Sequence, residues 1–260
     1  MSARTRRLGW LWAPLLLCFA FLYLPIAVLV VMSFNASKSP YRWEGVSTRW
    51  YTELFDDALI RESVINTLLV ATGATVVATV LGTLVAVGLA RYSRSNWLGA
   101  LAMAPAILPD LVLAIGLLVL YSMLSLTLGL VSVTVAHSVF GMAFVTAVVR
   151  ARLSQVDPSL EEASRDLGAT GLTTFLKVTL PSLWPAVIAG ALLSFTLSLD
   201  EFVIAFFTNG PTSPTLPITI YSSVRFGVTP EINALASLLL LVSFTAVIAV
   251  ARMTPRSDPQ

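Results

Sequence analysis

The chain has very few side chains that could bind a metal ion or form a covalent cross-link. Its 260 residues include one cysteine, Cys18, and one histidine, His137. A single cysteine excludes an intrachain disulfide and a thiolate metal cluster. Because the histidine lies far from the cysteine in the sequence, we expect no metal site and no bound cofactor. The roles of Cys18 and His137 stay open, although a lone histidine in an apolar run is most often hydrogen-bonded to a neighbouring helix.

Charged residues are scarce as well. They make up 12% of the chain, whereas about a quarter of a soluble domain is charged. Hydrophobic residues reach 57%, and the mean hydropathy is +0.85. A net charge of +2 is too small to suggest a nucleic-acid partner. So much apolar surface could not be kept from water, so lipid must surround much of the chain.

Long apolar runs predict an all-α polytopic membrane protein with about six transmembrane helices, because a spanning helix needs about 20 apolar residues. The first run is longer than the core of a secretory signal and has no small-residue cleavage site, so we expect it to be retained. The boundary between the third and fourth runs is the least defined. The runs cover residues 10–34, 63–90, 99–122, 129–149, 182–208 and 232–251.

The distribution of lysine and arginine predicts the orientation of these spans, since cytoplasmic loops carry the excess of both residues. We expect both termini and the loops at 91–98 and 150–181 to be cytoplasmic, and the loops at 35–62 and 209–231 to face outside. The whole chain, 1–260, then forms a single membrane domain. The cytoplasmic set is Arg4, Arg6, Arg7, Arg91, Arg94, Arg150, Arg152, Arg165, Lys177, Arg252 and Arg256, and the outer set is Lys38, Arg42, Arg49, Arg61 and Arg225.

The cytoplasmic segment 157–181 carries the signals of two short helices. Asp157 can cap the first helix, with Pro158 at its first position. Gly168 is typical of a helix C-terminal stop. Thr170 can cap the second helix, which ends at Pro181. We therefore expect a helix–glycine–helix elbow that is presented to the cytoplasm.

The elbow resembles a motif of the membrane subunits of ATP-binding-cassette importers, which reads Glu-Ala-Ala, three residues, Gly, nine residues, Ile, one residue, Leu-Pro. The spacing matches throughout, with Ser164 and Val178 as conservative departures. In that family the elbow docks into a groove on the ATPase subunit. By this resemblance the ATPase-coupling residues are Glu162, Ala163, Asp166, Gly168, Leu180 and Pro181. The alternative is an amphipathic helix on the membrane surface, but such helices are rich in Lys and Arg, and this segment has mixed charges.

Three carboxylates, Asp110, Asp200 and Glu201, lie within the predicted spans. Each costs at least about 2.5–3.5 kcal/mol at membrane depth, and no Lys or Arg in the same stretches can pair with them. A cationic substrate that comes and goes would offset this cost. The alternatives are a carboxylate satisfied by backbone or by an arginine of a partner subunit, and a proton relay. Asp110 follows two prolines that should kink or open its helix. Ser198 shares a helical face with Glu201, so we expect Ser198 to line the substrate pathway together with the three carboxylates.

Most of the chain also resembles spermidine/putrescine permeases, which belong to the binding-protein-dependent transport permeases. The corresponding permeases often have Asp-Asp where this chain has Asp200-Glu201. The resemblance rests on the runs Tyr23-Leu24-Pro25-Ile26, Ser33-Phe34-Asn35-Ala36-Ser37, Thr48-Arg49-Trp50-Tyr51, the nine residues from Leu197 to Ala205, and the fifteen residues from Ser222 to Ala236.

This resemblance implies a permease of type I ABC-importer architecture in the bacterial inner membrane, which moves polyamines inward by alternating access. It implies an ATPase dimer, a second homologous permease subunit and an extracytoplasmic polyamine-binding protein as partners. The chain has no glycine-rich phosphate loop with lysine, so it is not expected to be an enzyme, and ATP with Mg would bind the ATPase. The preference for putrescine or spermidine, the subunit that sets it, and a homo- or heterodimeric pore stay open.

Two further alternatives stay open. The outer-loop Trp50 could contact an amine through a cation–π interaction, or it could belong to an interfacial aromatic belt. The protein could also carry another cationic or small organic solute, or act as a secondary carrier or channel. The elbow counts against a carrier, because such a protein needs no ATPase dock.

Overall fold

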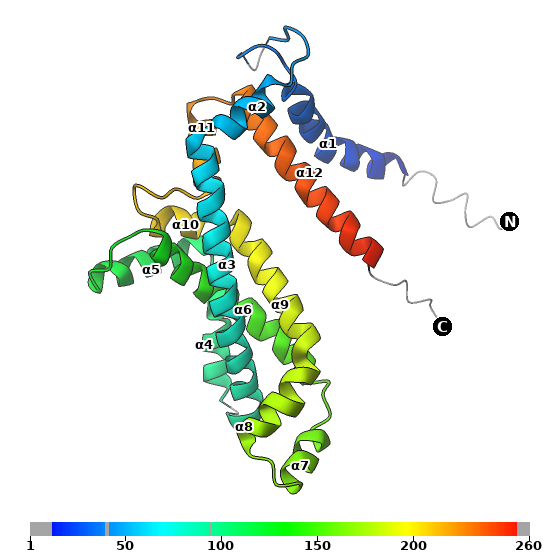
Figure 1. Ribbon diagram of the computed structural model, residues 1–260, viewed down its shortest axis with the longest axis vertical. Coiled ribbons are helices and arrows are strands. Elements are labelled where there is room, and N and C mark those ends of the chain that lie inside the picture. The colour runs from blue at the N-terminus through cyan, green and yellow to red at the C-terminus, as the bar shows by residue number, and fades with distance from the viewer. Residues whose placement is uncertain (1–11, 40–41, 94, 254–260) are drawn as a thin grey trace, which may run out of the picture. The chain divides into compact units, whose positions relative to one another are not determined.

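The computed structural model of the chain describes residues 12–39, 42–93 and 95–253 (Figure 1). The chain divides into two compact units, Met1–Arg61 with Ile220–Gln260 and Glu62–Thr219. The described residues form helices and a single isolated β-bridge, between Asn35 and Val46, so the predicted all-α class is confirmed. Five residues used for the orientation, and the side chain of Arg252, lie outside the described residues: Arg4, Arg6, Arg7, Arg94 and Arg256.

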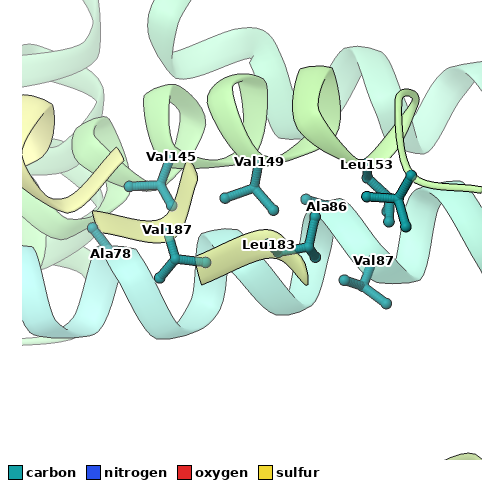
Figure 2. Packing of buried hydrophobic residues seen from close by; sticks show 9 residues of the cluster. Ala78, Ala86, Val87, Val145, Val149, Leu153, Leu183 and Val187 are labelled. Carbon is teal, nitrogen blue, oxygen red and sulfur yellow. The ribbon is translucent and has the colours of Figure 1, made fainter. Parts of the chain in front are cut away.

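The second unit is built on three packed helices, α3 (Ala58–Val87), α6 (Leu130–Leu153) and α9 (Leu180–Asp200). α3 begins in the first unit and continues as a π-helical turn, Gly88–Tyr92. Val145, Val149, Leu183 and Val187 fill the space between the three helices (Figure 2). Small residues permit this close packing. A Cβ at Gly82 of α3 would stand only 2.8 Å from the Cβ of Val145.

The third predicted span is two helices rather than one, which corrects the single run 99–122. α4 (Asn96–Ile107) and α5 (Asp110–Met123) meet at an angle of 107°. Leu108 at the break has ψ 142°, in the extended region, because the residue before a proline is disfavoured in the helical region. The kink expected from the prolines is therefore confirmed, at Pro109.

The fifth predicted span, 182–208, is also interrupted. α9 follows directly from α8 (Gly171–Thr174) and a π-helical turn, Phe175–Thr179. It ends at Asp200, where Glu201 takes an extended conformation with ψ 107°. The chain then resumes as α10 (Val203–Thr208). No proline or glycine lies at this break, so its cause must be sought in side-chain contacts.

The first unit contains α1 (Trp12–Met32), α2 (Arg49–Asp56) and α12 (Pro230–Met253), with α12 packed against both of the others. α11 (Leu216–Phe226) runs from the second unit into the first. Within the first unit, α1 has no buried residue. Its apolar side chains suit contact with lipid or with other membrane helices.

Within the described residues, four helical runs are long and apolar enough to cross a membrane, and the bent pair α4–α5 makes up to five. The four are α1, α3 with its π-helical turn, α6, and the run from α8 to α9. α12 has 24 residues, of which Pro230–Val242 are described as an apolar stretch. The prediction of about six spans therefore requires that α4–α5 and α12 also cross the membrane.

Candidate functional site

The first helix of the elbow and its glycine stop have the structure that the sequence predicts, but the second helix does not end at Pro181, because α8 continues through the π-helical turn into α9. α7 (Ser159–Asp166) forms its first helix, and an oxygen of Asp157 accepts a hydrogen bond from the Ser159 amide at 2.9 Å. This bond lowers the pKa of Asp157 below its ordinary value. Gly168 stops the helix with φ +85°, a left-handed conformation that L side chains rarely adopt. Thr170 caps α8 by accepting from the Thr173 amide at 3.3 Å.

The elbow presents an accessible face. Glu162, Ala163, Asp166 and Gly168 are exposed in the structure, as docking to a partner requires. Leu167 lies among them and is 89% exposed, a large apolar surface that the motif did not single out. Leu180 is partly exposed and Pro181 is exposed, at the beginning of α9.

A mostly buried ion pair holds the elbow against the membrane helices. The guanidinium Nε of Arg91 lies 3.1 Å from one carboxylate oxygen of Glu161. The hydroxyl of Thr179 donates to the other oxygen at 3.0 Å. Glu161 is only 7% exposed. These three residues, the elbow anchor, join α7 to the π-helical turn that continues α3 and to the π-helical turn that precedes α9.

Sequence reasoning missed the elbow anchor. Glu161 is one of two adjacent glutamates, and a helix places consecutive side chains about 100° apart, so the two can face different surroundings. The structure also explains why Ser164 stands where the motif has alanine, because the Ser164 hydroxyl lies 3.1 Å from that of Thr174 in α8. An alanine in this position could not make the bond between the two elbow helices.

The two helix breaks bring the three membrane carboxylates into one neighbourhood. Asp110 is the first residue of α5, Asp200 is the last of α9, and Glu201 follows it. The packing of α5 against α10 places the three residues at neighbouring helix ends. Asp110 and Asp200 are exposed, whereas Glu201 is partly buried. We call these residues the acidic cluster.

Packing between α5 and α10 fixes the breaks next to each other. Ala114 and Leu117 of α5 share one apolar core with Ile204 of α10 and with Phe140 of α6. Each of the two short helices therefore begins close to the acidic cluster. A carboxylate at a helix N-terminus is favoured by the helix dipole, by about 0.3–1 kcal/mol.

Glu201 has a structural partner of its own. Its Oε1 accepts a hydrogen bond from the Ile204 amide at 2.9 Å and so caps α10. This contact explains the break, because the capping side chain replaces a helical backbone acceptor. It also corrects the predicted shared helical face of Ser198 and Glu201, since α9 ends at Asp200 and Glu201 lies outside it. Ser194 and Ser198 are both buried.

His137 and Ser198 form a polar contact between α6 and α9. Nδ1 of His137 lies 2.7 Å from the Ser198 hydroxyl oxygen, and both residues are buried. The expectation of a histidine bonded to a neighbouring helix is confirmed. Ser198 therefore contacts α6 in this conformation, and it can support the acidic cluster by holding α9 in place.

Trp50 lies in α2 and packs against the segment that follows α1. Its indole nitrogen donates to the Asn35 carbonyl at 2.6 Å, and the side chain is only 4% exposed. The guanidinium carbon of Arg49 lies 4.2 Å from the centre of the ring. This face of the indole already holds a cation, so Trp50 stabilises this segment in the conformation described.

Comparison with known proteins agrees with this architecture. Residues 78–259 match the family described as binding-protein-dependent transport system inner membrane component. The putrescine transport system permease protein PotI of Escherichia coli K12 is 44% identical over 259 residues, which cover 95% of this chain and 92% of PotI. The spermidine/putrescine permease PotC of the same strain is 41% identical over 233 residues, covering 89% of this chain and 88% of PotC.

A solved structure extends the agreement to the fold. A bacterial ABC transporter involved in the import of the acidic polysaccharide alginate has a chain that aligns with a TM-score of 0.74. The alignment covers 98% of this chain and 99% of the other at 17% identity. At that identity the likeness concerns the fold alone, and it confirms the predicted importer-permease architecture. The chain therefore belongs to the family of binding-protein-dependent transport system inner membrane components, multi-pass proteins of the bacterial inner membrane.

Proposed function

We propose that this chain is a permease subunit of an ATP-binding-cassette importer and that it carries polyamines, putrescine or spermidine, into the cytoplasm by alternating access. The observation that carries the proposal is the acidic cluster, which lies at two adjacent helix breaks and has no Lys or Arg in an ion pair with it among the described residues. The polyamine names of relatives that are 41–44% identical support the same substrate class.

The chemistry of the acidic cluster suits an extended polycation. An ammonium group bound to a carboxylate forms a charge-assisted hydrogen bond, and a polyamine carries such groups at the ends of flexible methylene chains. Since Glu201 already accepts a backbone bond, we expect the exposed Asp110 and Asp200 to make the first contacts. Bound substrate would then also offset the repulsion among the three carboxylates.

The elbow supports a coupled mechanism. We propose that Glu162, Ala163, Asp166 and Gly168 contact a separate ATPase, on which ATP and Mg are bound. When the ATPase moves the elbow, Leu180 and Pro181 would transmit that movement to α9. α9 has 21 residues, which is about 30 Å at 1.5 Å per residue, and it ends at Asp200. One helix thus links the elbow anchor to the acidic cluster.

The remaining partners follow from the importer class. A second, similar permease subunit would complete the pore, and an extracytoplasmic binding protein would deliver the amine. The cytoplasmic placement of the elbow and of both termini belongs to the same proposal. Ser198, bonded to His137, would keep α9 in register with α6 while the breaks open and close.

The test is uptake by cells that contain the assembled transporter and lack other polyamine uptake. We expect ATP-dependent accumulation of labelled putrescine or spermidine. Labelled sulfate should not accumulate, because the acidic cluster would repel an anion. Gly168→Ala, which forces a side chain into a left-handed backbone, should reduce both ATPase binding and uptake. Gly168→Asn is the control, because asparagine tolerates that conformation. Uptake of sulfate but of neither amine would overturn the substrate assignment.

A further inference from the structure

A cavity of about 720 Å³ lies between the end of α3, the beginning of α4 and the end of α6. Arg91, Ser95, Asn96 and Arg150 supply its polar lining. Met103 and Ile107 of α4 line its apolar part. The cavity lies within the second unit, and none of the three residues of the acidic cluster lines it.

The polar part of the cavity carries an excess of positive charge. Both of its charged lining residues are arginines, and no described carboxylate lines it. Within the described part of the chain, the Arg150 guanidinium takes part in no salt bridge. Its Nη1 lies 3.5 Å from the position a Cβ would take at Gly99 of α4. A polyamine would be repelled from such a site.

Arg91 presents one group to the elbow and another that needs a partner. Its Nε bonds Glu161, but its Nη2 is buried and has no hydrogen-bond partner among the described residues. A buried donor without a partner is costly, and Arg91 is one of the residues that line the cavity. A guanidinium suits the oxygens of a phosphate group best, because its donors match their geometry.

The beginning of α4 adds to the positive electrostatic potential in the cavity. α4 has 12 residues, and the Ser95 side chain caps it by accepting from the Leu98 amide at 3.4 Å. Its positive end therefore lies at the cavity beside the two arginines, where an anion is favoured. Serine and asparagine side chains there can donate further hydrogen bonds to phosphate oxygens.

The surroundings of the cavity identify a lipid rather than a soluble anion. Tyr92 and Trp97 do not line the cavity but are next in sequence to the lining residues Arg91 and Asn96. They are 74% and 76% exposed, as aromatic residues are at a membrane–water interface. Away from the arginines the lining becomes apolar, with Ile107 exposed at 77%. This gradient from guanidinium to alkyl groups matches the gradient from headgroup to acyl chain.

We propose that the cavity binds the phosphate of an anionic phospholipid, phosphatidylglycerol or cardiolipin, between Arg91 and Arg150. Basic pockets between membrane helices on the cytoplasmic side recognise such headgroups. The assignment to the cytoplasmic leaflet rests on the orientation given under the proposed function. The Arg91 guanidinium would then contact both the lipid phosphate and Glu161, which connects the lipid to the elbow anchor.

The test measures lipid bound to the assembled transporter by native mass spectrometry, with no amine and no ATP present, so that its result does not depend on the substrate. The transporter is purified from membranes that contain both phospholipids. We expect Arg150→Gln to lower the affinity for added phosphatidylglycerol about tenfold or more, because a charge-assisted bond is lost. Arg152→Gln, on the same helix but outside the cavity, should change nothing.

A second variant tests the same proposal if Arg150→Gln folds poorly. Asn96→Asp places a negative charge on an exposed residue of the cavity, and we expect a similar loss of lipid. Arg150→Lys should restore part of the binding. Equal lipid occupancy in all variants would overturn the proposal. Displacement of the lipid by millimolar inorganic phosphate, or binding of inorganic phosphate with no lipid retained, would overturn the assignment to a phospholipid.

Discussion

At the scale of single residues, Glu161 and Glu162 show how neighbouring side chains of one type divide their roles. Glu161 is buried and bonds Arg91 and Thr179, whereas Glu162 is exposed. The first therefore holds the elbow in place, and the second is free to contact a partner. Substitutions at Glu161 and at Glu162 should therefore have different effects, the first on stability and the second on binding of the ATPase.

We predict that Glu161→Gln destabilises the protein by about 1–3 kcal/mol, because it leaves the Arg91 guanidinium without its countercharge. In proteoliposomes it should also lower the number of amines transported per ATP hydrolysed, since the elbow would be less firmly joined to α9. Glu162→Gln is the matched control. It should leave thermal unfolding unchanged and weaken ATPase binding instead. Equal unfolding temperatures for wild type and Glu161→Gln would contradict the role of the anchor.

The sequence predicted the elbow residues better than the contacts between them. Caps and stops at Asp157, Gly168 and Thr170 are local signals, because each depends on residues a few positions away. The Arg91–Glu161 pair joins residues 70 positions apart, and no local rule points from one to the other. The same holds for His137 and Ser198, which are 61 positions apart.

At the scale of helices, the two breaks have different physical origins. Pro109 separates α4 from α5 because a proline disfavours the helical conformation of the residue before it. The sequence therefore predicts a kink there. The break after α9 depends on Glu201, whose side chain caps α10. The run through 197–205 contains no proline or glycine, and its apolar pattern continues across the break. The sequence pattern therefore predicts one span over 182–208, and a side-chain contact interrupts it.

We predict that Glu201→Gln and Glu201→Leu differ in their effect. Glutamine keeps an oxygen that can accept from the Ile204 amide, so the break should persist and amine uptake should fall only partly. Leucine loses the cap, at a cost of about 0.5–2 kcal/mol, and should lower both thermal stability and uptake further. Uptake assays with unfolding in detergent measure the two effects. The same stability for both variants would show that the cap does not maintain the break.

Close packing of α3 against α6 gives a second prediction at this scale. Gly82→Ala would place its Cβ 2.8 Å from the Val145 Cβ and 2.9 Å from the Met142 carbonyl oxygen. Backbone cannot move aside easily, so we expect a destabilisation of about 1–3 kcal/mol. Gly116→Ala is the control, because nothing lies within 4 Å of a Cβ there. Thermal unfolding should separate the two variants.

At the scale of the molecule, charge is sorted along the second unit. The acidic cluster lies at the helix breaks, whereas Arg91 and Arg150 lie near the elbow, whose carboxylates include Glu161, the ion-pair partner of Arg91. α9 connects the two regions, from Leu180 to Asp200. Movement of the elbow would therefore reach the acidic cluster through one packed helix. The lipid cavity lies beside the elbow anchor, where it could influence that movement.

Affinity for the amine tests the central claim most directly. The measurement is the concentration dependence of putrescine and spermidine uptake by the assembled transporter, with wild type compared to Asp110→Asn and Asp200→Asn. Asp56→Asn, an exposed aspartate of α2 outside the acidic cluster, is the control. Each cluster variant should raise the half-saturating amine concentration about tenfold or more, since a charge-assisted bond is worth roughly 1.5–3 kcal/mol. Unchanged uptake in both, with normal assembly, would contradict an acidic polyamine pathway.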